Sequence, residues 1–83
     1  MSEKVKDLKI DKELDTRGLF CPEPLFEVRN ISETLKRGKI LKVLADDPAA
    51  EEDLKRWAKR TGTEFLDMNR EGNDLIFYFK ITK

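Results

Sequence analysis

The 83-residue chain contains no histidine and one cysteine, Cys21. The absence of histidine excludes Ser-His and Cys-His catalytic pairs. One cysteine without histidine also excludes a structural zinc site, and no cofactor is expected. The sequence has no GxGxxG or Walker motif, so the common nucleotide-binding loops lack support. If this protein performs covalent chemistry, Cys21 is therefore the expected nucleophile.

The sequence also lacks an excess of one sign of charge, and it lacks long apolar runs. The 17 Lys and Arg residues balance 17 Asp and Glu residues, so no global positive field would hold nucleic acid. No apolar stretch approaches the roughly 20 residues that span a bilayer, and residues 1–7 lack a signal-peptide core. A lone cysteine suits a reducing compartment. We therefore expect a cytoplasmic protein without membrane insertion.

The length allows one small domain. A single domain over residues 1–83 is expected, with residues 1–7 as a loosely ordered lead. Chains of this size bury only about 60% of their unfolded surface, so the core should be thin. A monomer is expected.

The spacing of hydrophobic residues predicts the order β-α-β-α-β-β. Apolar and charged residues alternate over residues 8–15, which is typical of a half-buried strand. Gly38 is expected to end the first helix as its C′ residue, and Asp46-Asp47-Pro48 to begin the second. The predicted elements are strand 8–15, a helix starting at Pro22, strand 40–45, helix 48–61, strand 65–70, a turn at 71–74 and strand 75–81.

This order predicts a two-layer α/β (α+β) sandwich with a four-stranded mixed sheet. Two helices that alternate with the first three strands can pack on one face of a sheet. The final hairpin makes the sheet mixed, because it adds antiparallel pairing. The helical faces expected to be buried are Leu25, Val28, Ile31 and Leu35 in the first helix, and Ala50, Leu54, Trp57 and Ala58 in the second.

Cys21 stands where the first helix is expected to begin. Unpaired N–H groups at a helix start carry about half a positive charge, which should hold the thiol pKa below its usual value of about 8.5. Pro22 and Pro24 stiffen the first turn, and Arg17 is a candidate for a nearby positive charge, whereas Glu23 would raise the pKa if close. These residues leave two interpretations open, a reactive thiolate and a small buried hydrophobe.

Other residues are candidates for shaping a partner surface. Phe20 is either an exposed docking contact or a core residue. Asp46 and Asp47 fit a helix N-cap, and their loop lies near the cysteine if the second strand neighbours the first. Arg29 belongs either to a basic rim that faces an acidic partner or tRNA phosphate, or to solvated surface.

The run Asp15-x-x-Gly18-x-x-Cys21-Pro22-x-Pro24 resembles the TusA/SirA (YeeD-like) family of small sulfur-carrier proteins. The similarity extends over about residues 8–81. It implies the same two-layer sandwich, with Cys21 as the catalytic residue. The positions expected to shape the site or contact partners are Arg17, Gly18, Phe20, Pro22, Glu23, Pro24, Arg29, Asp46 and Asp47.

The resemblance implies a sulfurtransferase that acts as a carrier rather than as a multi-turnover enzyme on its own. Cys21 would accept sulfane sulfur as a persulfide from a cysteine desulfurase or rhodanese-type donor and relay it to a thiol-bearing acceptor protein. The relayed sulfur would serve tRNA thiolation or another sulfur-trafficking pathway, and tRNA would be a partner only indirectly. Two alternatives stay open: a nucleic-acid-binding or regulatory module of the same fold, and a redox-sensing thiol protein.

Overall fold

The computed structural model describes residues 10–20 and 23–82. The lead predicted for residues 1–7 lies outside these ranges, and so do Cys21 and Pro22, including their predicted place at the helix start. The elements are β1 (Lys12–Asp15), α2 (Glu23–Thr34), β2 (Ile40–Ala45), α3 (Ala49–Thr61), β3 (Glu64–Glu71) and β4 (Asp74–Lys80).

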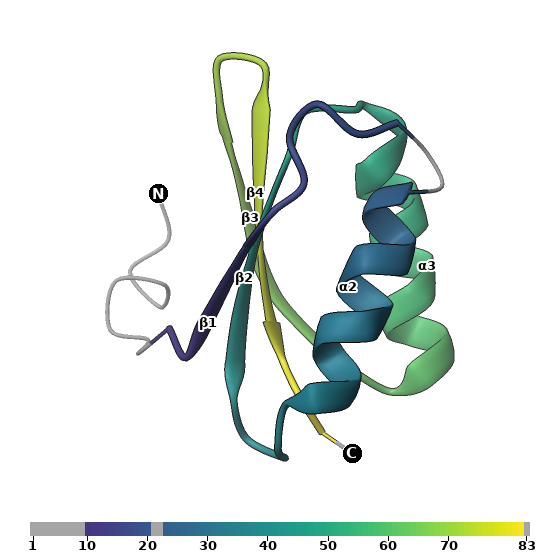
Figure 1. Ribbon diagram of the computed structural model, residues 1–83, viewed down its shortest axis with the longest axis vertical. Helices are drawn as coiled ribbons and strands as arrows, with labels where there is room; N and C mark the ends of the chain where they lie inside the picture. Colours follow the sequence, from purple (N-terminus) through teal and green to yellow (C-terminus); the bar gives the residue numbers. More distant parts are fainter. Residues whose placement is uncertain (1–9, 21–22, 83) are drawn as a thin grey trace.

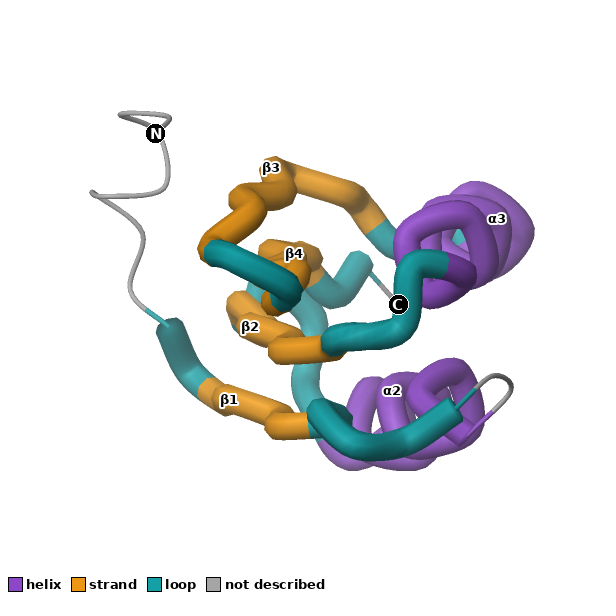
Figure 2. The backbone as a smooth tube through the Cα atoms, turned by 90° about the horizontal axis from the view of Figure 1, so that it is seen from above, coloured by secondary structure: helices purple, strands orange, loops and turns teal. Residues whose placement is uncertain are grey.

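The four strands form one mixed sheet in the order β1-β2-β4-β3. β1 pairs with β2 in parallel, whereas β4 pairs antiparallel with both β2 and β3. Both helices lie on the same face of this sheet (Figure 1), and the view from above separates the helical layer from the strands (Figure 2). The predicted two-layer sandwich is confirmed.

β4 takes an interior place because both of its faces are apolar. Phe77 and Phe79 are fully buried in the core beneath the helices. Ile76 and Tyr78 are buried in a second cluster with Leu44 and neighbouring apolar residues. Successive side chains of a strand point to opposite faces of the sheet. A strand that is apolar on both faces therefore buries the most surface in the interior of the sheet, where side chains of neighbouring strands lie on either side of its own.

The helices bury the faces that the sequence predicts. In α3 these residues are Ala50, Leu54, Trp57 and Ala58. Trp57 is 2% exposed and meets Phe79 edge-on, with ring centroids 5.7 Å apart. Val28 of α2 is fully buried. Leu25 and Ile31 of α2, and Leu35 just beyond its end, are partly buried against the core. This packing places the start of both helices at the end of the sheet where β1 and β2 finish (Figure 1).

The prediction that Gly38 ends the first helix is wrong. α2 stops at Thr34, and the Leu35 amide donates to the Ser32 carbonyl at 3.3 Å, which tightens the last turn. Gly38 belongs to a separate turn, where its φ of +91° suits glycine. Its amide donates to the carbonyl of Ile81 at 2.6 Å. Gly38 therefore serves the approach to β2, and the helix ends earlier because the chain must turn toward the sheet.

Candidate functional site

Two loops meet at the carboxyl ends of the parallel strands β1 and β2. One comprises residues 16–20 and leads to Cys21, and the other comprises residues 46–48. The Gly18 amide donates to both carboxylate oxygens of Asp46, at 3.1 Å each. The expectation that the Asp46–Asp47 loop approaches the cysteine segment if the strands are neighbours is thus supported by a direct contact with Gly18.

Thr16 ties the first loop to β2. Its side chain is fully buried, and its amide and hydroxyl both donate to the Leu44 carbonyl, at 2.7 and 2.6 Å. A buried hydroxyl needs such a partner, because an unsatisfied polar group costs free energy. Sequence reasoning did not single out Thr16, since nothing local to it shows that Leu44 lies alongside.

Gly18 allows the loop to turn. Its φ of +88° is a conformation that side chains with a Cβ rarely adopt, although an added Cβ would meet nothing within 4 Å. The Leu19 amide donates back to the Thr16 carbonyl at 3.2 Å, which closes the turn. Arg17 and Gly18 thus form a turn, and the need for glycine comes from the backbone rather than from space.

Arg17 joins this loop to the far hairpin. Its guanidinium binds both oxygens of Asp15, at 3.0 and 2.9 Å, and reaches Asp74 at the start of β4 at 3.2 Å. The hydrogen bonds from Arg17 lower the pKa of Asp15 to about 2. The hydrogen bonds that Arg17 donates to Asp15 and Asp74 raise the pKa of Arg17. The positive charge expected near the thiol is therefore balanced by two carboxylates, and Arg17 acts as a clamp. Asp74 was not anticipated.

The first turn of α2 begins on the other side of Cys21. The Glu23 amide donates to the Phe20 carbonyl at 2.8 Å, and the Glu23 side chain is exposed where an acid favours the helix dipole. Pro24 is buried and lies in one stripe with Val28. Its missing N–H costs nothing in a first turn, because no helical partner exists there. Pro24 thus fits the first turn of the helix and belongs to its buried face.

Two phenylalanines near Cys21 in sequence are exposed. Phe20 is 78% exposed and Phe26 is 52% exposed, so the core interpretation of Phe20 is wrong. Leu19, Glu23, Phe26 and Glu27 line a shallow groove of about 310 Å³. Phe26 was missed by sequence reasoning. The sequence did contain a signal for its exposure, because Phe26 does not fall on the apolar face formed by Leu25, Val28 and Ile31.

The remaining candidates have structural partners. Arg29 is exposed and lies 4.0 Å from Glu33 on the same helix. Of the expected basic rim, which comprises Arg17, Arg29, Lys36 and Arg37, Arg17 and Arg29 therefore face acids. Asp47 is an N-cap, as predicted. Its carboxylate accepts from the Ala49 amide at 3.0 Å, and Pro48 has helical angles of −56° and −29°.

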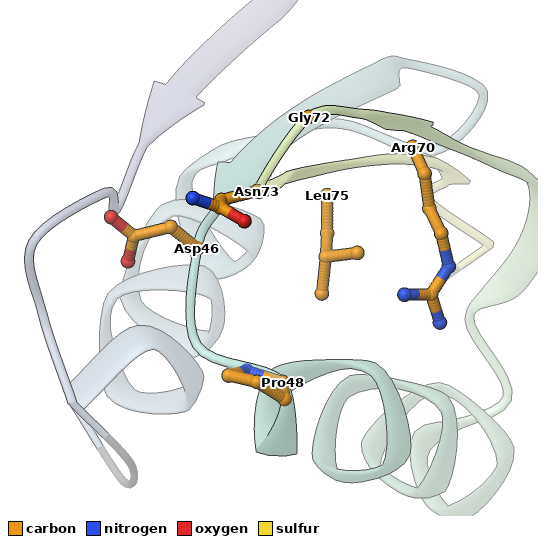
Figure 3. Close-up of a pocket in the computed structure, with 6 residues that line it drawn as sticks. All are labelled: Asp46, Pro48, Arg70, Gly72, Asn73 and Leu75. Carbon is orange, nitrogen blue, oxygen red and sulfur yellow. The ribbon is translucent and has the colours of Figure 1, made fainter.

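A second pocket, of about 330 Å³, opens beside this cap. It is lined by Asp46, Pro48, Arg70, Gly72, Asn73 and Leu75 (Figure 3). Figure 3 shows the Asp46 carboxylate pointing out of the pocket toward the preceding loop. Arg70 donates to Glu51 at 2.7 Å, so its positive charge is already paired with a carboxylate of α3. Among the described residues that line the pocket, none is therefore an unpaired cation for an anionic ligand.

Fold and site together define a class, small two-layer domains in which the segment leading to a cysteine follows the carboxyl end of a parallel strand. Residues 12–83 match the family model described as sulfurtransferase TusA. The chain belongs to the TusA family.

Individual relatives agree with this assignment. The chain is 42% identical over 73 residues to a protein of Archaeoglobus fulgidus provisionally named a sulfur carrier, covering 87% of this chain and 95% of that protein. It is 36% identical to the sulfur carrier protein TusA of Allochromatium vinosum, covering 84% and 92%. A SirA-like protein of Desulfitobacterium hafniense has the same fold, with a TM-score of 0.76 at 18% identity, covering 87% and 99%.

Proposed function

We propose that this protein accepts sulfane sulfur as a persulfide on Cys21 and relays it to a thiol of an acceptor protein. The observation that carries the proposal is the family match over residues 12–83, with relatives named as sulfur carriers, in a chain whose only cysteine is Cys21. The described residues on either side, Phe20 and Glu23, are both exposed. Exposure supports the proposal, since two proteins must bring their sulfur atoms together.

The transfer is a thiol exchange in two steps. The Cys21 thiolate attacks the terminal sulfur of a donor persulfide. A new S–S bond forms as the donor S–S bond breaks, and the donor leaves as a thiolate. An acceptor thiolate then attacks the terminal sulfur of the Cys21 persulfide and releases the Cys21 thiolate. Neither step needs a general acid or a metal, which suits a chain without histidine.

The partners are part of the proposal. The donor is a cysteine desulfurase or a rhodanese-type protein, the acceptor carries a thiol, and tRNA thiolation is one end use. The carrier works as a monomer in a reducing compartment such as the cytoplasm. In the part of the chain that the structure describes, no helix is long and apolar enough to cross a membrane.

The test is intact mass after incubation with a cysteine desulfurase and L-cysteine, or with rhodanese and thiosulfate. The wild-type protein should gain about 32 Da, the mass of one sulfur atom, and lose it on treatment with a thiol. Cys21→Ser should gain nothing, while the matched surface variant Glu64→Gln should gain as the wild type does.

Three results would count against the proposal. A mass gain in Cys21→Ser would remove Cys21 from the chemistry. Sulfenic acid or glutathione adducts in place of the persulfide would favour a redox sensor. Salt-sensitive RNA binding that survives Cys21→Ser, with no loading from either donor, would favour the nucleic-acid module.

A further inference from the structure

Cys21 is bracketed in sequence by an exposed apolar surface. We define the Phe20–Phe26 surface as Leu19, Phe20, Glu23, Phe26 and Glu27. Its two phenylalanines are the large hydrophobic residues that the structure leaves exposed within residues 10–20 and 23–82. Leu19, Phe26 and the two glutamates share one groove. Phe20 adjoins the groove through its carbonyl, which accepts from the Glu23 amide at 2.8 Å. Contiguous exposed apolar surface on a protein commonly marks an interaction site.

Charge on this surface is uncompensated. Glu23, Phe26 and Glu27 are three and four residues apart in α2, so they share one face of the helix. Neither Glu23 nor Glu27 has an ion pair with any residue in the described ranges. By contrast, Glu51 pairs with Lys55 on α3 at 2.9 Å. The surface therefore combines two exposed aromatic side chains with two carboxylates that have no ion-pair partner in the described ranges.

We infer that the Phe20–Phe26 surface docks the sulfur-donating protein, through an apolar pocket bordered by Lys or Arg side chains. This inference rests on the proposed function. Exposed aromatic residues bind as anchors in pockets, and complementary charge around them sets orientation and the rate of association. The surface comprises residues on both sides of Cys21 in sequence, so a donor seated on it contacts the residues that adjoin the proposed sulfur acceptor along the chain.

Other occupants fit the charges less well. Nucleic acid would place phosphates against Glu23 and Glu27. A symmetric dimer through the same surface would place these glutamates against their own copies, because a two-fold interface uses one patch twice. A protein surface with an apolar pocket and a basic border fits both kinds of residue, because the pocket takes the aromatic rings and the border pairs with the glutamates.

The experiment compares loading by a protein donor with loading by a small one. The protein donors are a cysteine desulfurase with L-cysteine and rhodanese with thiosulfate, and the small donor is inorganic polysulfide. For Phe20→Ser and Phe26→Ser, the ratio of protein-mediated to polysulfide loading should fall about tenfold, chiefly through KM, as expected for the loss of an interface anchor. Phe20→Leu and Phe26→Leu keep an apolar side chain and should recover most of the ratio. Thermal unfolding confirms that each variant is folded.

A second pair of variants tests the charge. Glu27→Lys should lower the ratio several-fold and weaken its dependence on salt. Glu64→Lys makes the same change of charge at an exposed position of β3, next to Lys80 and the chain end, and should leave the ratio as in the wild type.

The outcomes separate the two proposals. If both serine variants keep the wild-type ratio, the docking surface is overturned while the persulfide chemistry stands. If Glu27→Lys and Glu64→Lys act alike, the acidic residues have no part in docking. If polysulfide loads Cys21 and neither protein donor does, a sulfur-donating protein is not the occupant. Loading of Cys21→Ser would overturn the proposed function itself.

Discussion

The two parallel strand–loop–helix units of this protein, β1 with α2 and β2 with α3, are built differently. The second passes from strand to helix through residues 46–48, with Asp47 as a local cap. The first uses a longer connection, residues 16–22. The described part of this connection is held by hydrogen bonds to the second unit, from Thr16 to Leu44 and from Gly18 to Asp46. The unit that carries the cysteine thus depends on its neighbour for position.

The exposed faces of the two helices differ in the same sense. On α3, Glu51 pairs with Lys55 and Glu52 pairs with Arg56. In each pair the two residues are one helical turn apart, a spacing at which opposite charges stabilise a helix. On α2, Arg29 and Glu33 approach only to 4.0 Å, and Phe26 is exposed. The surface of α3 therefore contributes to stability, whereas α2 leaves groups available for contact. The difference can be tested by matched substitutions in the two units.

The largest contrast concerns one aromatic residue from each helix. Trp57→Ala should cost about 3–5 kcal/mol of unfolding free energy, because Trp57 is buried against Phe79. Phe26→Ala should cost about 1 kcal/mol or less, since its ring is half exposed. Urea unfolding followed by circular dichroism measures both. Similar costs would contradict the division of roles between the helices.

Gly18→Ala tests the loop that leads to Cys21. The positive φ of Gly18 should make alanine cost about 1–2 kcal/mol. Gly62→Ala is the matched control, because Gly62 ends α3 with a φ of 79°. Both variants should lose stability, measured by urea unfolding. Only Gly18→Ala should also slow persulfide loading from polysulfide, and equal loading in the two variants would show that the loop geometry is irrelevant to transfer.

Removing the cap of α3 should have a smaller effect. Asp47→Ala loses the side-chain acceptor of the Ala49 amide and should cost about 1 kcal/mol. Asp47→Asn keeps an acceptor oxygen and should lose less. The midpoint of thermal unfolding reports both changes. An alanine variant as stable as the wild type would mean that Pro48 alone is sufficient to start the helix.

Asp46→Ala tests the bridge between the two loops. The Gly18 amide would lose its carboxylate acceptor, and the stability change should stay below about 1 kcal/mol because the bond is exposed. Faster hydrogen exchange at the Gly18 amide is the expected local signal. Asp46→Asn retains an acceptor and should exchange more slowly than the alanine variant. Unchanged exchange in both would argue that the bridge does not order the loop.

The smallest effect is on pH dependence. Arg17 lowers the pKa of Asp15 in the folded protein to about 2, below its usual value of 3.8. Stability from this pair is therefore present above the usual pKa and is lost as pH falls toward 2. Asp15→Asn should flatten the acid limb of stability between about pH 5 and 2. High salt should reduce the difference, because the pair is exposed to solvent.

Local patterns were sufficient for much of the fold. The apolar spacing in α3 predicted which residues are buried, and the cap at Asp47 followed from its place before Pro48. The sequence alone did not indicate that β4 lies between β2 and β3, because strand order depends on pairing between distant segments. Gly38 was misassigned since a glycine after a helical pattern suits either a helix end or a separate turn.

The candidate site divides in the same way. Phe20 was a candidate from its place beside the cysteine, but only the fold shows that its ring is exposed. The partners of Thr16 and Arg17, namely Leu44 and Asp74, lie far along the chain. No local spacing predicts such contacts, because they exist only once the strands have paired.

The sequence by itself determined the single cysteine, the family and the element order, since these depend on composition and on neighbours within a few residues. The tertiary structure decided where the loop before Cys21 is held and which side chains around it remain free to bind. The physical reason is that parallel pairing of β1 with β2 brings Gly18 to Asp46, whereas packing of α2 on the sheet leaves Phe26 and Glu27 facing solvent.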